Sequence, residues 1–384
     1  MKNKKRKIAY ISGTRADFGL MTSVLANINK SNKLKLCLYA TGMHLMPEFG
    51  KTIDEIKKFF PEVVPIQAVF KTDDKFGAAN FTGEFLVELI KILSKDKPNL
   101  VLTLGDRSEM LCAAIAALYL SIPTAHIHGG ERTLTVDEIN RHAITKLSHI
   151  HFPATKESAN RIIKMGEENW RVNVVGAPYL DIILNKKLPS RQELFKLLGN
   201  INPEDKFILL TQHPFGNADE TKNQMREILS AIKTFNLPII AIYPNADPGG
   251  KRIIKIINQE KNNPLFHIFP SLPYEQFLAL EKEAAVWVGN SSGAMIESPT
   301  FKTPVVNVGG RQFNRQRGGN VIDVGYDRKE IIVAIDKSLN NKEYRTKIAK
   351  SISPWGDGKT GPRITKILEN LKINARLLDK QITY

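Results

Sequence analysis

Cysteine is almost absent from this chain. Only Cys37 and Cys112 occur among 384 residues, and both stand in apolar surroundings without the paired spacing of a metal motif. A disulfide framework needs a dense set of cysteines, and a structural zinc site needs several thiolates or histidines in a fixed pattern. The scarcity indicates neither a disulfide framework nor a thiolate metal site, and we expect both thiols to be buried packing residues.

Long hydrophobic runs are lacking as well. The longest apolar stretch, from Met110 to Leu120, is too short for a bilayer, which takes about 20 residues. The basic start from Lys2 to Lys7 leads only into Ile8-Ala9-Tyr10-Ile11 before polar residues follow, so no secretory signal is indicated. We therefore expect a cytoplasmic protein without a membrane partner.

Acidic residues are outnumbered. The chain has 39 acidic and 55 basic residues, which gives a formal net charge of +16. The lysines are scattered, and neither a basic stripe nor an aromatic platform accompanies them, so we do not expect a nucleic-acid partner. Two explanations stay open, because the charge either steers a polyanionic small substrate or reflects a lysine-rich proteome.

Several well-known nucleotide and nucleophile motifs are missing. The segment from Gly13 to Gly19 is not G-x-G-x-x-G, so a dinucleotide site is not supported, and neither a P-loop nor a G-x-S-x-G elbow occurs. We therefore turn to what the chain does contain, which is two polar clusters, each directly after a short apolar run.

Strand-like and helix-like segments alternate along nearly the whole chain. Repeated strand–helix units imply parallel sheets with right-handed crossovers. The first half has apolar runs at 7–11, 34–39, 100–104, 124–127 and 172–175, and the second half at 207–211, 239–242, 266–269, 285–288, 305–308 and 321–324. Helical patterns between the later runs include 294–299. We predict an α/β fold with two Rossmann-like domains facing each other across a cleft.

The domain boundaries follow from composition. The polar segment 186–203, with two prolines, is the predicted junction. We therefore assign residues 1–185 to an N-terminal domain, residues 186–361 to a C-terminal domain, and residues 362–384 to a C-terminal segment. Its helix near 362–371 is expected to pack back on the first domain.

The first polar cluster runs from Gly105 to His142 and is rich in acids and bases. Gly105-Asp106-Arg107 ends a strand, so Asp106 serves either in a structural ion pair or in proton transfer. In a strand His126 and His128 point to one side, and Gly129-Gly130 lets a ligand approach the backbone. A zinc site is possible there, although the spacing matches no established motif. At the start of the next helix, the acids complement the helix dipole or pair with Arg141 and His142.

The second cluster, from Gly289 to Glu297, offers backbone amides, hydroxyls and a carboxylate. Asn290-Ser291-Ser292-Gly293 lies between a strand and a helix, where amides and the helix dipole favour a diphosphate. Glu297, four residues after Gly293, is placed along that helix to accept hydrogen bonds from ribose hydroxyls. Arg15 in the first loop serves either as a diphosphate ligand or as a surface residue of a glycine turn.

Taken in order from Lys7 to about Leu371, these motifs resemble the UDP-N-acetylglucosamine 2-epimerase family. Gly13-Thr14-Arg15-Ala16-Asp17, Gly105-Asp106-Arg107 and Arg141-His142-Ala143-Ile144-Thr145-Lys146 are similar to its hydrolysing branch, which makes precursors of sialic and legionaminic acids. The non-hydrolysing branch tends to have Gly-Thr-Arg-Pro-Glu and Gly-Asp-Thr instead. The chain departs from many hydrolysing members at His128, where they carry glutamate.

The resemblance implies a GT-B-like fold of two Rossmann-like domains, a UDP-sugar substrate, neither cofactor nor metal, and a homodimer. Its implied catalytic residues are Asp106, His128, Glu131 and Asp137. Its implied substrate-binding residues are Arg15, Arg107, His213, Asn245, Ser291, Ser292, Glu297 and Arg311.

The implied reaction is chemically reasonable because the C2 proton of the sugar is not activated by a carbonyl. Anti-elimination of UDP removes this proton and gives a 2-acetamidoglucal. Water then adds at C1 while C2 is reprotonated from the other face. Arginines and helix N-termini would stabilise the departing diphosphate.

Three other functions stay open at this point. A GT-B glycosyltransferase would share the nucleotide site but need an acceptor, and a non-hydrolysing epimerase would return a UDP-sugar. A nucleotide-sugar sensor would bind the ligand without requiring so many titratable groups. Among sugars, UDP-GlcNAc and UDP-2,4-diacetamido-2,4,6-trideoxyglucose are both candidates, because their groups at C4 and C6 are distinguished by pocket shape.

Overall fold

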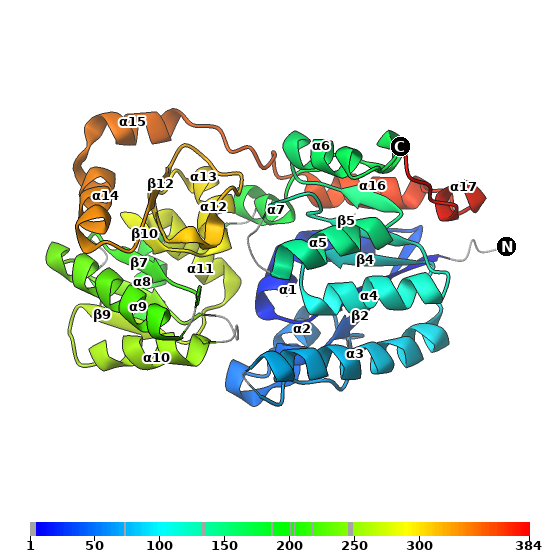
Figure 1. The fold of residues 1–384 in the computed structure, drawn as a ribbon, viewed down its shortest axis with the longest axis horizontal. Helices are drawn as coiled ribbons and strands as arrows, with labels where there is room; N and C mark the ends of the chain where they lie inside the picture. The colour runs from blue at the N-terminus through cyan, green and yellow to red at the C-terminus, as the bar shows by residue number, and fades with distance from the viewer. Residues whose placement is uncertain are drawn as a thin grey trace. The chain divides into compact units, whose positions relative to one another are not determined.

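The computed structural model describes residues 5–72, 74–132, 136–185, 187–199, 201–202, 204–216, 218–244 and 249–384. The chain forms two compact units (Figure 1). Unit 1 comprises Met1–Asn185 and Trp355–Tyr384, and unit 2 comprises Lys186–Pro354. None of the helices in the described ranges is both long and apolar enough to span a membrane.

Unit 1 is built on a six-stranded parallel sheet of order β3-β2-β1-β4-β5-β6. This is the Rossmann order, in which the direction of strand addition reverses between β1 and β4. Ligands bind such sheets at the carboxyl ends of the strands that flank this reversal. The strands are β1 Arg6–Ser12, β2 Leu34–Ala40, β3 Val64–Pro65, β4 Leu100–Leu104, β5 Thr124–Ile127 and β6 Ile150–Phe152.

Helices cover both faces of the unit 1 sheet, because successive strand residues point to opposite sides. Ile8 and Tyr10 of β1 pack in one core with α1 and α16, while Ala9 and Ile11 pack in another with α3 and α4. The helices are α1 Arg15–Lys30, α2 Ile53–Phe59, α3 Lys75–Asp96, α4 Ser108–Tyr119, α5 Val136–Leu147, α6 Lys156–Lys164, α7 Pro178–Asn185, α16 Thr360–Asn370 and α17 Ala375–Leu378, with 3₁₀ turns at Gly42–Leu45, Pro47–Phe49 and Asn169–Arg171.

Unit 2 repeats this topology. Its parallel sheet has the order β12-β11-β10-β7-β8-β9, which is the Rossmann order when the strands are counted from β7. The reversal therefore lies between β7 and β10. The strands are β7 Ile208–Thr211, β8 Ile239–Ile242, β9 Phe266–Phe269, β10 Val286–Gly289, β11 Val305–Val308 and β12 Val321–Val324.

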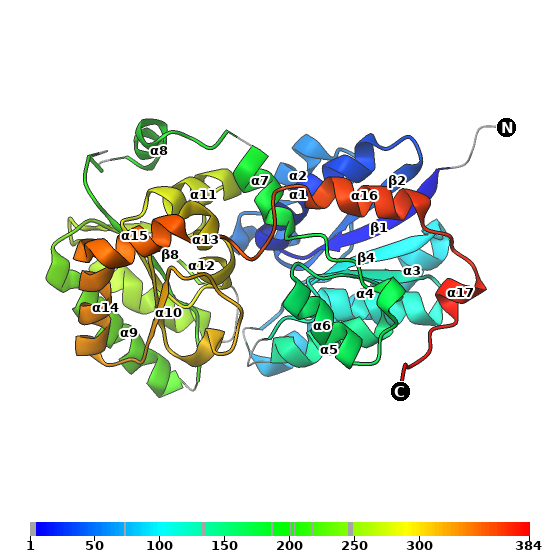
Figure 2. The same cartoon turned by 90° about the horizontal axis from the view of Figure 1, so that it is seen from above.

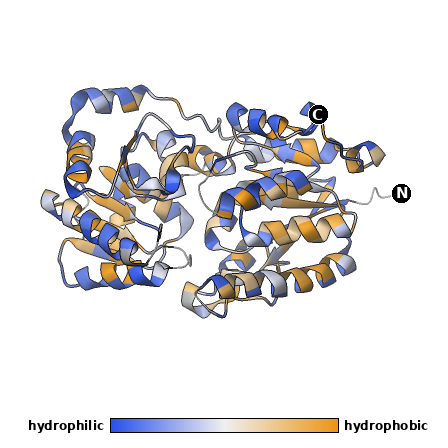
Figure 3. Ribbon diagram, viewed as in Figure 1, coloured by the Kyte–Doolittle hydropathy of each residue, from blue (hydrophilic) through white to orange (hydrophobic). Residues whose placement is uncertain are grey.

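The unit 2 sheet is also covered on both faces. Ile208 and Leu210 pack with α9, α10 and α14, whereas Leu209 and Trp287 pack with α8, α11 and α12. In Figure 3 the strands of both sheets are mostly orange, as burial on two faces requires. The helices are α8 Arg191–Leu198, α9 Ala218–Ile232, α10 Gly250–Ile257, α11 Tyr274–Glu283, α12 Ser292–Ile296, α13 Ser298–Phe301, α14 Arg328–Asn340 and α15 Lys342–Lys350, with 3₁₀ turns at Lys233–Phe235, Asn258–Glu260 and Gly310–Gln312.

The predicted α/β fold with two parallel sheets is confirmed, but two local predictions, the strand 172–175 and the helix 294–299, are wrong. The segment 172–175 is not a strand and contributes only an isolated bridge between His151 and Val172. The sixth strand is β6 instead, because the backbone of Ile150–Phe152 pairs with β5. The predicted junction 186–203 begins where unit 2 begins, and it contains α8, where the Ser190–Glu193 capping box starts a helix that buries Leu194 and Phe195. The predicted helix 294–299 is interrupted at Glu297, so α12 and α13 are separate.

The C-terminal segment returns to unit 1 earlier than the sequence predicts, at Trp355 instead of Pro362. Helix α16 packs on α1 and α7, as Figure 2 also shows. Buried Asp181 of α7 accepts hydrogen bonds from the backbone N–H groups of Thr360 and Gly361 at 2.7 and 2.6 Å. The hydroxyl of Ser23 on α1 donates to the same carboxylate at 2.9 Å. This one carboxylate therefore joins α1, α7 and α16.

Asp181→Ala should lower the free energy of unfolding of unit 1 by about 2 kcal/mol, because it removes the cap of α16 and leaves two buried N–H groups unpaired. Chemical denaturation measures this difference. The control is Asp54→Ala, which removes an exposed carboxylate from the first turn of α2. Equal stability of the two variants would contradict the capping role.

Candidate active site

A buried arginine connects the polar loops at the edge of the unit 1 sheet. Arg141 of α5 is 2% exposed, and its Nη2 donates to the Asp106 carboxylate in the loop after β4. Its Nη1 donates to the carbonyl oxygen of His128, after β5, at 2.6 Å and lies 3.9 Å from Glu131 Oε2. Burial lowers the pKa of Arg141, but Asp106 and Glu131 outweigh this effect and raise it. The guanidinium thus holds two loops and two carboxylates together.

His128 and Glu131 form a second pair in the same place. The Nδ1 atom of His128 hydrogen-bonds Glu131 Oε1, and both side chains are buried. The His128 ring also packs against Tyr179 and Trp355, with ring centroids 6.2 and 6.4 Å away. Because a carboxylate only accepts, Nδ1 carries the proton in this pair, which fixes the orientation of the imidazole.

His126 has a different role from the one that strand alternation predicts. Strand β5 ends at Ile127, and His128 has a φ of 60°, so the two histidines do not share one face of a strand. Fully buried His126 bonds Thr145 Oγ1 of α5 at 3.1 Å and the Gly105 carbonyl at 2.8 Å. Burial lowers its pKa to about 3. His126 is therefore a neutral bridge between α5 and the Asp106 loop.

Asp137 lies half-buried in the first turn of α5, four residues before Arg141. Its charge is among those that raise the pKa of Arg141. Of the two predicted ion pairs on this helix, Glu138 pairs with His142 at 3.5 Å, while Arg141 bonds Asp106. Asp106, His128, Glu131 and Arg141 are thus one cluster, with Asp137 on the adjoining turn.

The segments after β1 and β4, which flank the strand-order reversal of unit 1, approach each other at Glu109, whose charge is paired with Arg107. The guanidinium of Arg107 pairs with buried Glu109, at 3.1 and 3.2 Å. Glu109 leaves no room for a side chain at Gly13, where a Cβ would lie 2.2 Å from its Oε1. Arg15, at the start of α1, pairs with Glu55 of α2, with 2.5 Å between Nη2 and Oε1.

The first loop is organised by buried Asp17. Its carboxylate accepts hydrogen bonds from the backbone N–H groups of Gly13 and Thr14 at 2.8 Å each and from the Ser12 hydroxyl. Burial raises the pKa of Asp17 to about 6 despite these donors. Asp17 thus fixes the Gly13–Arg15 turn that presents Arg15.

At the strand-order reversal of unit 2, Asn290 joins the ends of three strands. Fully buried after β10, it accepts from the His213 N–H at 2.7 Å and donates to the His213 carbonyl at 3.0 Å. Its own carbonyl accepts from Gln312 Nε2 at 3.0 Å and Arg311 Nη1 at 3.2 Å. The predicted ligands His213 and Arg311 therefore lie beside Asn290.

Gly289 permits this close approach. It has a φ of 135°, and a Cβ there would lie 1.9 Å from the Thr211 carbonyl oxygen at the end of β7. The chain then turns into α12, with half-buried Ser291 at its N-cap and Ser292 as its first residue. The Ser291 side chain makes no capping bond to this helix.

Glu297 lies at the break between α12 and α13 and is 5% exposed. Its Oε1 accepts a hydrogen bond from the Tyr274 hydroxyl, on α11, at 2.9 Å. The carboxylate is therefore held from a neighbouring helix rather than projecting from a helix face. Asn245, the remaining predicted ligand, lies outside the described residues. Within the described part of the chain, no group of three or more histidine, cysteine and acidic side chains is arranged to hold a metal.

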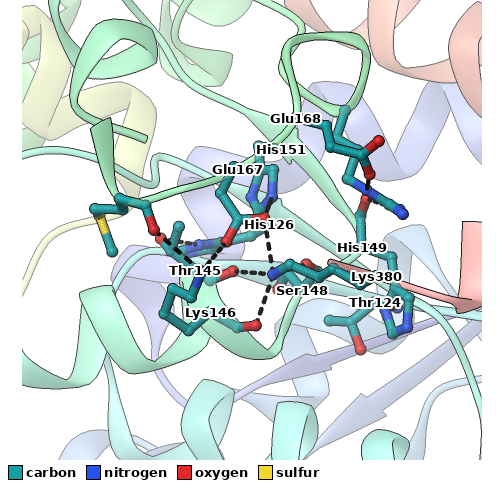
Figure 4. Close-up of polar contacts among 12 residues, drawn as sticks. Thr124, His126, Thr145, Lys146, Ser148, His149, His151, Glu167, Glu168 and Lys380 are labelled. Atoms are coloured by element: carbon teal, nitrogen blue, oxygen red, sulfur yellow. Dashed lines mark hydrogen bonds and ion pairs between the residues drawn. The ribbon is translucent and has the colours of Figure 1, made fainter. Parts of the chain in front are cut away.

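The far end of α5 is held by a buried network (Figure 4). Lys380 Nζ donates to the carbonyls of Lys146 and Ser148 at 2.6 and 2.7 Å and pairs with Glu167 at 2.8 Å. His151 and Lys146 also donate to Glu167, at 2.9 and 2.7 Å. The C-terminal tail thereby caps the helix that carries Arg141.

Sequence reasoning missed several of these positions. The sequence places Arg141 and Asn290 in the two polar clusters but does not indicate their connecting roles, because their partners are 35 and 77 residues away. It does not single out Glu109 or Gln312 at all. The one signal that the sequence offers for Arg141 is the pair of acids, Asp137 and Glu138, shortly before it in the same helix. No sequence pattern predicts the contacts of Glu167 and Lys380, because their partners lie in separate segments of the chain.

Comparison with known proteins gives matches over nearly the full length. The family model for UDP-N-acetylglucosamine 2-epimerase matches residues 26–369. The chain is 39% identical over 381 residues to the UDP-N,N'-diacetylbacillosamine 2-epimerase (hydrolyzing) of Legionella pneumophila, covering 99% of this chain and 100% of that protein. It is 35% identical to the GDP/UDP-N,N'-diacetylbacillosamine 2-epimerase (hydrolyzing) of Campylobacter jejuni, covering 89% of each.

Two further matches name another sugar. The UDP-N-acetylglucosamine 2-epimerase of Neisseria meningitidis is 32% identical, covering 95% of each chain. Among solved structures, the UDP-GlcNAc 2-epimerase of Methanocaldococcus jannaschii, in complex with UDP-GlcNAc and UDP, superposes with a TM-score of 0.80. Its sequence is 26% identical, and the match covers 95% of this chain and 100% of that one.

Glu167→Gln should lower the free energy of unfolding at pH 7 by about 3 kcal/mol. Burial alone would raise the pKa of Glu167, but hydrogen bonds from His151, Lys146 and Lys380 bring it to about 2. A lowered carboxyl pKa stabilises the fold above the ordinary value of 4.5, and this contribution disappears as the pH falls towards 2.

Chemical denaturation of both proteins between neutral and acidic pH measures the difference. The control Glu88→Gln, in an exposed pair with Lys91, should change stability by less than about 0.5 kcal/mol. A difference that does not shrink in acid would show that the Glu167 charge is not the cause.

Proposed function

Since the chain belongs to the UDP-N-acetylglucosamine 2-epimerase family, we propose that it is a hydrolysing UDP-sugar 2-epimerase acting on UDP-2,4-diacetamido-2,4,6-trideoxyglucose, the UDP derivative of N,N'-diacetylbacillosamine. The observation that carries this proposal is the 39% identity, over the full chain, to a hydrolysing enzyme named for that sugar. The products are UDP and the free 2-epimer, a 2,4-diacetamido-2,4,6-trideoxymannose.

The cluster in unit 1 supports an acid–base role. Elimination needs a group that takes the C2 proton, and rehydration needs groups that activate water and return a proton from the other face. Asp106, His128, Glu131 and Asp137 supply these groups within two loops and one helical turn. Arg141 donates to Asp106 and balances the nearby acidic charge, so that the carboxylates lie close together without an added metal ion.

In the first step a carboxylate of the cluster accepts the C2 proton while the C1–O bond to UDP breaks with its electron pair. The product is the 2-acetamidoglucal, with a double bond between C1 and C2. In the second step water adds its oxygen to C1, its proton passes to a base of the cluster, and an acid of the cluster protonates C2. The paired His128–Glu131 imidazole is suited to such proton exchange because its orientation is fixed.

The loops at the strand-order reversals supply the side chains that we assign to diphosphate binding. Arg15 and Arg107 of unit 1 carry the cationic charge that a departing diphosphate needs, and Arg311 of unit 2 adds another. In unit 2 we assign His213, Ser291 and Ser292 to the phosphates and Glu297 to the ribose hydroxyls, with Asn245 as a further UDP ligand. Asn290 is a positioning residue, because its hydrogen bonds fix His213 and Arg311.

The second candidate substrate is UDP-GlcNAc, which the 32% identical relative from Neisseria meningitidis favours. Both sugars carry the 2-acetamido group that the elimination needs. With either sugar, the free 2-epimer serves as a precursor for sialic or legionaminic acid synthesis. We also propose that the protein forms a homodimer and is located in the cytoplasm.

Incubation with each UDP-sugar in heavy water, without an acceptor, tests the reaction class by NMR. We expect free UDP and a free sugar with deuterium at C2, because the glucal is reprotonated from solvent. The diacetamido sugar should react with at least a tenfold higher kcat/KM than UDP-GlcNAc, roughly the discrimination that a few pocket contacts give. A UDP-linked epimer would show a non-hydrolysing enzyme, and an acceptor requirement would show a glycosyltransferase.

Asp106→Asn should lower kcat at least about 100-fold, because it removes an acid–base group but keeps the shape of the side chain. UDP affinity, measured by calorimetry, should stay within roughly threefold, since Asp106 bonds Arg141 rather than the proposed UDP ligands. The control is Glu138→Gln, which changes an acid on α5, the helix of Arg141. Glu138 pairs with His142, and this variant should retain turnover. Lost UDP affinity in Asp106→Asn would argue against the catalytic assignment.

A further inference from the structure

Glu281 is a buried acid of unit 2 that has no cationic partner among the described residues. It lies on α11 and is 0% exposed, and no N–H or O–H group in the described part of the chain donates a fixed hydrogen to either carboxylate oxygen. An ionised carboxylate in that situation is unfavourable by several kcal/mol, so buried acids are normally paired or protonated. The position therefore needs an explanation that packing alone does not give.

The neighbour of Glu281 is the proposed ribose ligand. Oxygens of Glu281 and Glu297 converge on Gly293, where a Cβ would lie 2.9 Å from Glu297 Oε2 and 3.6 Å from Glu281 Oε1. The two carboxyl groups also act on each other's pKa, so they are direct neighbours. Two ionised carboxylates that lie side by side in a buried place repel each other, and neither has a hydrogen to donate, so a proton on one of them is favoured.

Burial and the adjacent charge decide where the proton lies. Burial, followed by the charge of Glu297, raises the pKa of Glu281 well above its usual value. Burial also raises the pKa of Glu297, but hydrogen bonds from Glu281 and Tyr274 act in the opposite direction. The Tyr274 hydroxyl donates to Glu297, whereas no donor among the described residues reaches Glu281, so the charge is favoured on Glu297 and the proton on Glu281.

The neighbouring elements add few other charges. Helices α12 and α13 and strand β11 contain no charged residues. Glu275 and Lys282 on α11 are exposed, and half-buried Glu283 pairs with Arg191 of α8 at 3.3 Å. The remaining charged residues of α8 are exposed Glu193 and Lys196. Among the described residues, only the two carboxyls and Tyr274 act on the pKa values of the pair.

We propose that Glu281 is a proton-holding positioning residue for the nucleotide subsite, whose carboxyl O–H donates to Glu297 and directs that carboxylate to the ribose hydroxyls. This inference rests on the proposed function in one respect, the assignment of Glu297 to the ribose. An ionised carboxylate has about four acceptor positions. Tyr274 and Glu281 occupy two of them, which leaves about two for a pair of adjacent hydroxyls.

The proton makes nucleotide affinity depend on pH in a defined direction. As the pH rises and Glu281 ionises, its donor is lost and two buried carboxylates repel each other, so UDP affinity should fall. Glutamine at position 281 keeps an N–H donor that does not titrate. The ratio of the dissociation constants of wild type and Glu281→Gln should therefore increase with pH, while the titration of UDP itself cancels.

Two measurements test the proposal on the full-length protein. The infrared difference spectrum between wild type and Glu281→Gln at neutral pH, without nucleotide, should contain the C=O band of a protonated carboxyl. Calorimetric UDP titration should give Glu281→Gln an affinity within about twofold of wild type at neutral pH, and Glu281→Leu an affinity roughly tenfold weaker, as expected for one lost charge-assisted hydrogen bond. Glu275→Gln, which changes an exposed acid on the same helix, is the matched control.

The outcomes distinguish a failure of the role of Glu281 from a failure of the proposed function of the protein. A missing carboxyl band, or Glu281→Leu binding UDP as tightly as wild type, overturns the role of Glu281. A wild-type protein that does not bind UDP overturns the proposed function instead, and the infrared band still decides whether the pair holds a proton. Thermal denaturation of Glu281→Leu shows whether that variant is folded, and Glu281→Gln, which is nearly isosteric, keeps the test valid if it is not.

Discussion

The buried guanidinium of Arg141 is the interaction on which the unit 1 site depends. A charge that is 2% exposed must be matched by its surroundings, and here it contacts Asp106, Glu131 and the carbonyl of His128. These partners belong to loops after two different strands, so neither loop can move without leaving a buried charge unpaired. The helix that carries Arg141 is held at its other end by Lys380, which caps its last carbonyls and pairs with Glu167. Residues at the end of the chain thus help to determine the geometry of loops near its middle.

In unit 2 the loops at the strand ends are connected by an uncharged side chain. The sheet of unit 2 has the same strand order, and the reversal again brings two strand ends together, but Asn290 makes the connection. An amide both donates and accepts, so it can bond the backbone of His213 in both directions while its own carbonyl receives Arg311 and Gln312. Cationic side chains are then held at the edge of the cluster.

Much of the fold follows from local patterns, and much of the site does not. Short apolar runs identify the main strands because parallel strands are buried on both faces. The pattern fails for β6, because this strand of three residues has a histidine, His151, at its centre. The histidine is fully buried and is paired with Glu167, which lies outside the strand. It also fails at Glu297, since a helical pattern from 294 to 299 does not reveal that the Tyr274 hydroxyl holds this side chain at a break between two helices. Motif order identifies Asp106, His128 and Glu131, whereas Arg141 becomes central only through contacts across 35 residues.

The two units therefore stabilise buried carboxylates by opposite means, and the chemistry of each site explains the choice. In unit 1 a permanent cation lies against the acids that we propose exchange protons with the substrate, and a guanidinium does not compete for those protons near neutral pH. In unit 2 a cation beside Glu297 would occupy the acceptor positions that the ribose needs. A neutral carboxyl on Glu281 uses only one of them, and it satisfies the pair without cancelling the charge that attracts hydroxyl donors. The pair of Glu281 and Glu297 is therefore compatible with the proposed role of Glu297 in binding hydroxyl groups.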